Sequence, residues 1–350
     1  MTLMGSKSCL MHIIRKLILN HSIIHSPIIH AHSPTPIGSQ KLGAMENNVP
    51  KIDLSARRSS VSTKIVKACE KYGFFMVANH DVPLNVVGEL EQQGLQFFAR
   101  PMAEKLRAGP GTPYGYGCNR IGPSGDMGAL EYLTLSTNPA SPDYIARRAR
   151  TISNRPSKFS SAASEYAEAV RGLACMLLDL TAEGLRVLND TSVFSNLIMD
   201  DNSDSILRLN YYPPSNDHSI GFGEHTDPQI FTILRSNEVD GLQISTQGNW
   251  ITVPSDPNAF CVFVGDTLKA MTNGRFVSVR HRAVTNSQQT RMSIAFFGAP
   301  SLQALIAPLP EMVPAGMAPL YKPFTWEEFK RQMYSGSLRL GDDRLNHFRA

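Results

Sequence analysis

The stretch from residue 205 to residue 300 most limits what this chain can fold into. It consists of short apolar runs rich in β-branched and aromatic residues, and turn-forming sequences such as SNEVDG, TQGN, PSDPN and TNG separate them. Short runs interrupted at close intervals by Asn, Asp, Gly and Pro are typical of a β-sandwich or barrel. The sequence therefore predicts an all-β region here, without an internal repeat of solenoid or propeller length.

The residues before this region have mainly helical patterns. Apolar residues recur at helical spacing over 55–70, between Pro83 and Pro101, and from about 158 to 188. We interpret residues 74–78 as a buried strand and the glycine- and proline-rich stretch 109–128 as a loop. The glycines of that loop lack GxGxxG spacing, which argues against a dinucleotide or phosphate site. The predicted fold class is mainly β with flanking helices and an α-rich N-terminal half.

The first 44 residues differ in composition from the rest of the chain. They contain four Lys and Arg residues and no Asp or Glu, so they account for the whole net charge of +4. The lack of acidic residues resembles an organelle transit peptide. The sequence MENNVPKIDLS from Met45 resembles a natural amino terminus instead, and we favour this second interpretation. We expect a disordered or non-native extension (1–44), a helical region (45–195), a β region (196–301) and a C-terminal helical region (302–350).

Composition excludes several classes of partner. Without the first 44 residues the chain is close to neutral and has no stripe of Lys and Arg, so we expect no nucleic acid partner. The sequence contains no long uncharged apolar run of the kind that predicts a membrane span. The five cysteines are scattered and never form a CxxC pair, which favours a reducing compartment. We expect a cytoplasmic protein, although a nuclear location and targeting to an organelle stay open.

The β region contains a pattern typical of metal ligands. The sequence GEHTDP supplies His225 and Asp227, and VRHRAV supplies His281 further along the chain. Residues two apart on a strand project to the same face, so the histidine and the carboxylate of an HxD motif can approach one ion. Two imidazoles and one carboxylate suit Fe(II) and leave three positions open for a bidentate cosubstrate and dioxygen. An isolated HxD is a weak signal, because such a short motif also occurs by chance.

A second short motif strengthens the metal-site hypothesis. Arg291 and Ser293 form an RxS sequence ten residues after His281, again with the two-residue spacing of a strand. A guanidinium that binds a carboxylate end-on, with a hydroxyl beside it, suits the distal acid of a small diacid. Alone, this arginine would more often form a surface salt bridge. The ordered set of HxD, His and RxS predicts a metal and cosubstrate site.

At these motifs the chain resembles the plant 2-oxoglutarate-dependent dioxygenases. An NYYPP sequence (210–214) precedes the HxD, and the N-terminal GFFMVANHDVP and FFARPMAEK also resemble that family, so the similarity runs from about Pro50 to Arg349. The resemblance implies a double-stranded β-helix, or jelly-roll, core within residues 196–301. It implies Fe(II), 2-oxoglutarate and dioxygen, with ascorbate as the reductant. It also implies that Tyr212 and Asn210 bind the cosubstrate together with Arg291 and Ser293.

Longer segments resemble one subgroup, the gibberellin 2-beta-dioxygenases. These segments are GYGCNRIGPSGDMGALEYL, GFGEHTDPQIFTILRSN, GDTLKAMTNGRFVSVRHRAVTN, APLPEMV and YKPFTWEEFK. The resemblance implies hydroxylation of a gibberellin at carbon 2, which inactivates the hormone. Ala129 occupies a position that is commonly Trp in the family, so the preference among individual gibberellins stays open.

A gibberellin is a rigid, mostly apolar diterpenoid with a carboxylate, so its pocket needs apolar walls and a cation. Phe297 shares a strand face with Arg291 and Ser293 by even spacing, and we expect it to form a wall. Phe231 and Tyr116 are further wall candidates. Arg120 and Lys322 are candidates for the carboxylate anchor, although each would more often be a solvated surface charge.

The sequence leaves three further functions open. Another plant 2-oxoglutarate oxygenase of the same fold would act at a different gibberellin position or on a flavonoid. A non-catalytic hormone-binding module would keep the fold without turnover, and a zinc-dependent hydrolase would need neither dioxygen nor 2-oxoglutarate. The sequence does not determine the oligomeric state, so both a monomer and a homo-oligomer are compatible with it.

Overall fold

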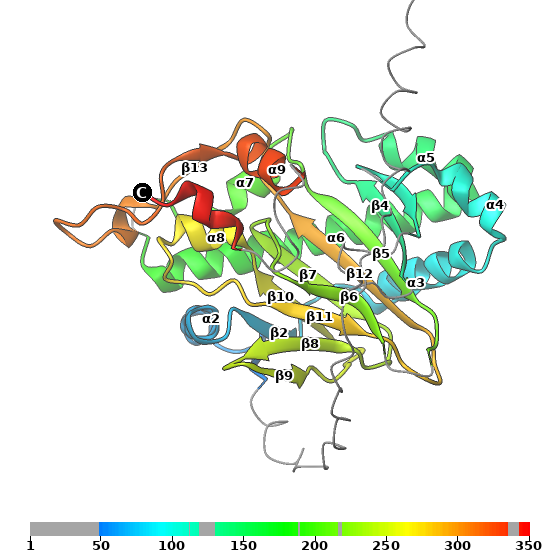
Figure 1. The fold of residues 1–350 in the computed structure, drawn as a ribbon, viewed down its shortest axis with the longest axis horizontal. Coiled ribbons are helices and arrows are strands. Elements are labelled where there is room, and N and C mark those ends of the chain that lie inside the picture. The colour runs from blue at the N-terminus through cyan, green and yellow to red at the C-terminus, as the bar shows by residue number, and fades with distance from the viewer. Residues whose placement is uncertain (1–48, 112, 119–129, 188–189, 216–218, 335–342) are drawn as a thin grey trace, which may run out of the picture. The chain divides into compact units, whose positions relative to one another are not determined.

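Two β-sheets form the centre of the structure, which is a computed structural model (Figure 1). It describes residues 49–111, 113–118, 130–187, 190–215, 219–334 and 343–350. The predicted extension, Arg120 and Ala129 lie outside the described residues. Within the part that is described, the chain after Met45 folds as one compact unit.

The larger sheet has eight strands. In spatial order they are β1 (Lys51–Asp53), β2 (Phe74–Ala78), β10 (Ala259–Val264), β7 (Phe231–Ser236), β12 (Arg291–Gly298), β5 (Ile206–Tyr212), β4 (Glu131–Ser136) and β3 (Gly115–Gly117). The smaller sheet contains, in order, β6 (Ile220–His225), β11 (His281–Val284), β8 (Leu242–Thr246) and β9 (Asn249–Thr252). A separate pair joins β13 (Leu305–Ile306) to β14 (Phe324–Thr325).

Central strands of the large sheet, such as β2, β10 and β12, carry buried residues on both faces. On β5, Leu207 and Leu209 belong to the main hydrophobic core, whereas Asn210 and Tyr212 line a cavity between the two sheets. A second apolar cluster, which includes Phe263, joins the large sheet to the small one. Because successive side chains of a strand point to opposite faces, one strand contributes to both the core and the cavity.

Four helices pack against strands of the large sheet: α2 (Arg58–Lys71), α3 (Leu84–Phe98), α5 (Tyr144–Ile152) and α6 (Pro156–Leu185). The other helices are α4 (Met102–Lys105), α7 (Ser195–Met199), α8 (Asp266–Met271), which contacts β13, and α9 (Trp326–Tyr334), which contacts β14. Short 3-10 helices are η4 (Leu106–Ala108), η5 (Pro310–Met312) and η6 (Arg344–Phe348). The long α6 contacts α2, α3 and α5 as well as β7 and β12. Helix α6 begins with Pro156. Proline has no backbone N–H, and the first N–H groups of a helix have no partner within the helix, so proline is well tolerated there.

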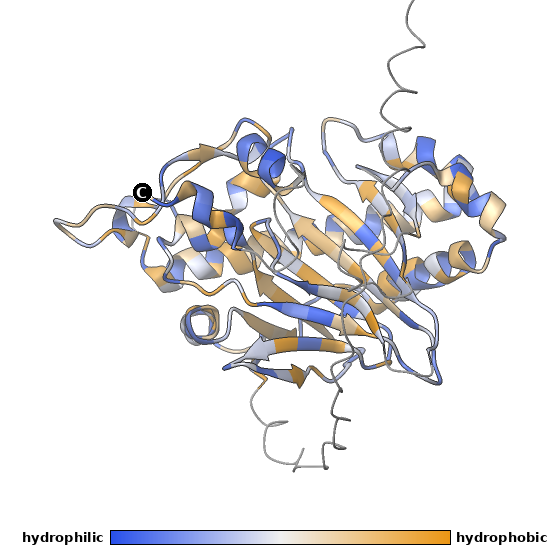
Figure 2. Cartoon of the chain, in the orientation of Figure 1, coloured by the Kyte–Doolittle hydropathy of each residue, from blue (hydrophilic) through white to orange (hydrophobic). Residues whose placement is uncertain are grey.

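The hydropathy of the chain matches this arrangement (Figure 2). The central strands of the large sheet are coloured mainly as hydrophobic, and the surrounding helices carry both hydrophobic and hydrophilic residues. This is the pattern of amphipathic helices that pack one stripe on a sheet. None of the helices in the described ranges has the length and apolar character needed to cross a membrane.

The predicted mixture of β-sheets and flanking helices is confirmed, including the three helices and the strand at residues 74–78. Two details differ. The stretch interpreted as loop contains β3, and β4 follows it, so the helical N-terminal half contributes four strands to the large sheet. In β4, five of the six residues are buried, and residues 133–136 alternate between leucine and a hydroxyl residue, which was the signal that could have identified the strand.

Candidate metal and cosubstrate site

Two adjacent strands bring the predicted metal ligands together. β6 ends at His225 and β11 begins at His281, and the antiparallel register pairs these two residues directly. Their ring centroids lie 4.3 Å apart. Asp227 Oδ1 lies 3.6 Å from Nε2 of His225 and 3.7 Å from Nε2 of His281. All three side chains are buried, and one potential ligand atom from each lies within 4.8 Å of the others.

Backbone carbonyls orient both imidazoles. Nδ1 of His225 lies 2.7 Å from the carbonyl oxygen of Gly223, and Nδ1 of His281 lies 3.2 Å from that of Val279. A carbonyl oxygen can only accept, so Nδ1 donates in each case and Nε2, the atom that approaches Asp227, is the one that could bind a metal. Burial and the neighbouring His281 hold the pKa of His225 well below its ordinary value, which keeps this imidazole neutral.

The unpaired oxygen of Asp227 shows that a cation fits this cluster. Asp227 is 3% exposed, yet its Oδ2 atom has no hydrogen-bond partner. A buried carboxylate without a partner is costly, and a divalent ion between it and the two Nε2 atoms would remove that cost. Two neutral imidazoles and one carboxylate are the ligand set that suits Fe(II).

The backbone after the HxD sequence is held by the start of α8. The N–H groups of Asp266 and Thr267 donate to the carbonyl oxygens of Asp227 and Pro228 at 2.7 and 3.2 Å. Gly265 comes so close to this turn that a Cβ atom there would lie 1.8 Å from the carbonyl oxygen of Gln229. Only glycine permits this approach, and the ligand-bearing turn is therefore fixed against the helix.

Arg291 provides a buried positive charge in the same cavity. It is 1% exposed, and its Nε and Nη1 atoms have no hydrogen-bond partner. Its guanidinium carbon lies 5.1 Å from the ring centroid of Tyr212, its register partner on β5. Ser293 lies two residues along β12, and its Oγ accepts from Nδ2 of Asn210 at 3.4 Å. A buried guanidinium with unused donors, beside a hydroxyl, fits the carboxylate of a small diacid.

One cavity contains both groups. Its lining includes the three candidate metal ligands, and the other predicted site residues that line it are Asn210, Tyr212, Arg291, Ser293 and Phe297. The cavity runs between the two sheets, so residues of β5 and β12 face residues of β6 and β11 across it. The sequence motifs thus meet in one cavity, which Arg291 and the three candidate metal ligands line together.

The structure does not support two of the predicted wall residues. Phe231 lies on the face of β7 that points to the helices, where it is fully buried and its ring lies 6.3 Å from that of Phe75. Thr232 lines the cavity instead. Tyr116 also belongs to the helix-side core, and its hydroxyl donates to Glu131 at 2.6 Å. Both predictions failed because these strands are buried on both faces, so burial alone does not show which face a residue takes.

The two candidates for the carboxylate anchor have different outcomes. Lys322 is exposed, its backbone N–H donates to the carbonyl oxygen of Phe348 at 2.8 Å, and it does not line the cavity. Arg120 lies outside the described residues, so its position stays untested.

Sequence reasoning missed a cation beside the cavity. Arg208 lies on β5 two residues before Asn210, and its Nε donates to the Oδ1 atom of Asn210 at 2.9 Å. Its guanidinium carbon lies 4.0 Å from the ring centroid of Tyr132 and 5.4 Å from that of Phe222, whose ring packs 4.2 Å from the ring of His225. The even spacing from Asn210 and Tyr212 was the signal that could have identified it.

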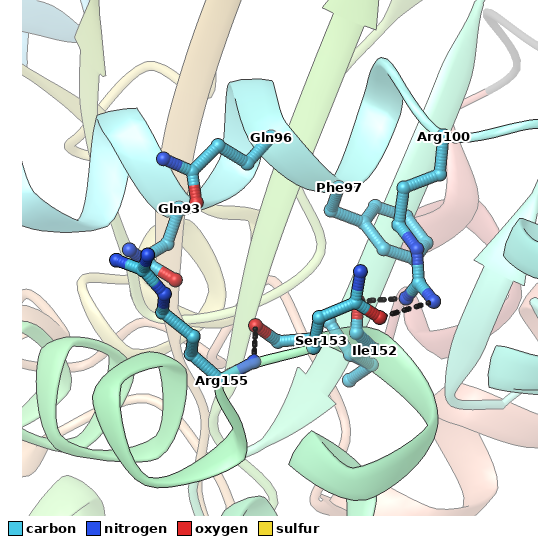
Figure 3. A pocket seen from close by; sticks show the side chains of 8 residues that line it. Gln93, Gln96, Phe97, Arg100, Ile152, Ser153 and Arg155 are labelled. Atoms are coloured by element: carbon cyan, nitrogen blue, oxygen red, sulfur yellow. Dashed lines mark hydrogen bonds between the residues drawn. The ribbon is translucent and has the colours of Figure 1, made fainter.

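A second pocket lies away from the sheets, between α3 and the segment that joins α5 to α6 (Figure 3). Arg100 on its wall already donates to Glu104, to the carbonyl oxygen of Ile152 and to Asn154. Among the residues that the structure describes, the cluster of His225, Asp227 and His281 is the one group found with metal-ligand geometry. The pocket in Figure 3 therefore does not compete with the cavity as a metal site.

Comparison with known proteins identifies the family. Residues 203–300 match the profile of the 2OG-Fe(II) oxygenase superfamily, and residues 49–150 match that of the non-haem dioxygenase in morphine synthesis N-terminal region. The chain belongs to the 2OG-Fe(II) oxygenase superfamily. It is an Fe(II)- and 2-oxoglutarate-dependent dioxygenase, as the motifs predicted, and the predicted jelly-roll fold and the two cofactors are confirmed.

Curated relatives match this dioxygenase over most of its length. Gibberellin 2-beta-dioxygenase 4 of Arabidopsis thaliana is 49% identical over 330 residues, covering 89% of this chain and 98% of the relative. Gibberellin 2-beta-dioxygenase 2 of Oryza sativa subsp. japonica is 46% identical, covering 86% of this chain and 87% of the relative. The crystal structure of JOX2 in complex with 2OG, Fe and JA superposes with a TM-score of 0.76 at 28% identity, covering 86% of this chain and 89% of that one.

Proposed function

We propose that this dioxygenase hydroxylates gibberellins at carbon 2 in the β orientation and so inactivates the hormone. The observation that carries the proposal is the similarity to eight gibberellin 2-beta-dioxygenases, at 41–49% identity over most of the chain. The cavity supports it, because apolar side chains and the buried guanidinium of Arg291 line it together with the metal ligands.

The cofactors would supply the oxidation, and the residues of the chain would position the reactants. Fe(II), which His225, Asp227 and His281 would hold, would supply the oxidation together with 2-oxoglutarate and dioxygen. One oxygen atom of dioxygen replaces the C–H bond by C–OH, and the other enters succinate as 2-oxoglutarate loses carbon dioxide. Arg291, with Ser293 beside it, fixes the far carboxylate of 2-oxoglutarate by charge and hydrogen bonding. Phe222 and Phe297 exclude water from the cavity. The chain contributes position and a dry environment to the reaction.

We assign the gibberellin carboxylate to Arg208. The guanidinium stacks on Tyr132 and lies 5.4 Å from the ring centroid of Phe222, whose ring packs 4.2 Å from that of the ligand His225. Stacking on aromatic rings holds the planar group in one orientation, which favours a two-point contact with a carboxylate. Arg208 thus supplies the cation that a gibberellin pocket needs.

Replacement of Arg208 by methionine should raise KM for the gibberellin by at least ~10-fold, because a charged partner of a buried carboxylate is lost. KM for 2-oxoglutarate should stay within about 2-fold of the parental value, since Arg291 and not Arg208 binds the far carboxylate of 2-oxoglutarate. Steady-state kinetics with each substrate varied in turn measure both values. Arg147→Met removes a side chain that is 63% exposed and serves as the control. A rise in KM for 2-oxoglutarate alone would place Arg208 at the cosubstrate instead.

A product assay tests the function itself. Purified protein with Fe(II), ascorbate and 2-oxoglutarate is given a panel of gibberellins, and products are analysed by mass spectrometry against 2β-hydroxylated standards. We expect 2β-hydroxylated products. About one succinate should form for each gibberellin consumed, because one turnover consumes one gibberellin and one 2-oxoglutarate. Untouched gibberellins together with an oxidised flavanone would make the protein a flavonoid oxygenase.

The same assay separates this function from the nearest alternative, because hydroxylation at another carbon identifies a different gibberellin oxygenase. Membership of the Fe(II)- and 2-oxoglutarate-dependent dioxygenases leaves neither a non-catalytic hormone-binding module nor a zinc-dependent hydrolase as an alternative. Turnover should accordingly stop under anaerobic conditions or without 2-oxoglutarate. A cytoplasmic location, a homo-oligomer and the regional division of the chain at residues 45, 196 and 302 stay predictions.

A further inference from the structure

We propose that Arg344, in the C-terminal 3-10 helix η6, is a positioning residue that works with Asp266 to hold the HTD turn in its metal-binding geometry. The inference rests on the metal site and not on the gibberellin as substrate. It assigns a role in metal binding to a segment that lies 118 residues from the turn in the sequence.

The contacts connect Arg344 with the middle of the HTD sequence. Nη1 of Arg344 donates to the carbonyl oxygen of Thr226 at 2.8 Å, and Thr226 lies between the ligands His225 and Asp227. The same Nη1 lies 3.6 Å from Oδ2 of Asp266. The hydroxyl of Thr226 donates to that Oδ2 atom at 3.1 Å. Guanidinium, carboxylate and threonine thus form a closed set of interactions around the residue between the two ligands.

Asp266 also holds the backbone of Asp227, the second metal ligand of the HTD turn. Its own N–H donates to the carbonyl oxygen of Asp227 at 2.7 Å, and its side chain is 3% exposed. The pairing of β6 with β11 ends at His225, so neither Thr226 nor Asp227 is held by a strand partner. The contacts from Asp266 and Arg344 take the place of sheet pairing in this turn.

Neighbouring residues of the C-terminal segment hold the backbone of Arg344 in place. Leu345 is fully buried, and its N–H donates to the Oδ1 atom of Asp343 at 3.1 Å. The ring of Phe348 packs 4.3 Å from that of Phe324, and its carbonyl oxygen accepts from the N–H of Lys322 at 2.8 Å. The side chain of Arg344 is 14% exposed, so it enters the protein from a segment that Leu345 and Phe348 anchor.

A metal site depends on the groups that orient its ligands, and loss of such a group typically lowers metal affinity by ~10–100-fold. Without Arg344 the HTD turn keeps its residues but loses the contacts that hold the carbonyl of Thr226. Its ligands would then sample geometries in which Asp227 and His225 no longer point at the same ion.

The test measures Mn(II) affinity by electron paramagnetic resonance of the free ion, with the full chain and without 2-oxoglutarate. The double variant Asp266→Asn, Arg344→Met removes both charges, so it leaves no buried carboxylate uncompensated. It should bind Mn(II) ~10–100-fold more weakly than the parent. Arg344→Lys keeps the charge but not the planar fork, and an intermediate loss of affinity is expected.

Arg349→Met is the matched control, because Arg349 lies on the same segment, is 52% exposed and contacts Asn346 and Asp343 but not the HTD turn. Its Mn(II) affinity should match that of the parent. Unchanged Mn(II) affinity in the double variant, with only a lower melting temperature of the metal-free protein, overturns the proposal and leaves a purely structural role. If the double variant does not fold, Arg344→Lys decides: parental affinity overturns the proposal, and reduced affinity at an unchanged melting temperature supports it.

Metal dependence of the rate separates this inference from the proposed substrate. Excess Fe(II) should restore most of the rate in the Arg344 variants, because the defect is in metal binding. Failure of gibberellin turnover in the parent protein would leave the Mn(II) measurement unaffected, so the two proposals can fail independently.

Discussion

Replacing Asp227 by alanine should lower succinate formation by at least ~10³-fold, because the metal contributes several kcal/mol to the reaction and loses its one charged ligand. The metal-free variant should melt at or above the temperature of the parent, since the parent buries a carboxylate whose Oδ2 has no partner. The rise in melting temperature on adding Mn(II), which reports binding to the folded state, should disappear.

Asp201→Ala is the control for this variant, because the Asp201 side chain is exposed and far in sequence from the HxD motif. It should keep the parental rate of succinate formation and the parental response to Mn(II). Parental turnover in Asp227→Ala would remove the proposed metal site, whereas lost turnover with an intact response to Mn(II) would place Asp227 in a role other than metal binding.

Replacing Arg291 by methionine should raise KM for 2-oxoglutarate by roughly 30-fold or more, because loss of one partner of a buried charge pair costs about 2–5 kcal/mol. Mn(II) affinity in the absence of 2-oxoglutarate should stay at the parental value, since Arg291 is not a metal ligand. The metal-free variant should be as stable as the parent or more stable, because a buried guanidinium with two unpaired nitrogens is replaced by an apolar chain of similar length.

Arg275→Met provides the comparison, because the Arg275 side chain is 45% exposed and pairs with Glu70 on the surface. Its KM for 2-oxoglutarate should equal that of the parent. An unchanged KM in Arg291→Met would show that the far carboxylate of 2-oxoglutarate binds elsewhere.

The candidate site could be predicted to the extent that it depends on spacing along single strands. Two-residue spacing predicts that Arg291, Ser293 and Phe297 share a face of one strand, and all three line the same cavity. The direction of a side chain relative to its neighbours on a strand follows from the backbone alone, so no knowledge of the tertiary structure was needed.

The choice of face could not be predicted for strands that are buried on both sides. Phe231 and Thr232 are adjacent on β7 and both are buried, yet only Thr232 lines the cavity. Both sides of this strand exclude water, one against the helices and one against the small sheet, and polarity therefore gives no signal.

The sequence by itself determined the metal-binding residue types, their spacing on the strands and the mixture of sheet and helix. The tertiary structure decided which distant residues meet: His281 pairs with His225, Arg208 stacks between Tyr132 and Phe222, and Arg344 binds the HTD turn. Local spacing fixes where a side chain points along its own strand or helix. Contacts between segments far apart in the sequence depend on how the whole chain packs, and no short pattern encodes that packing.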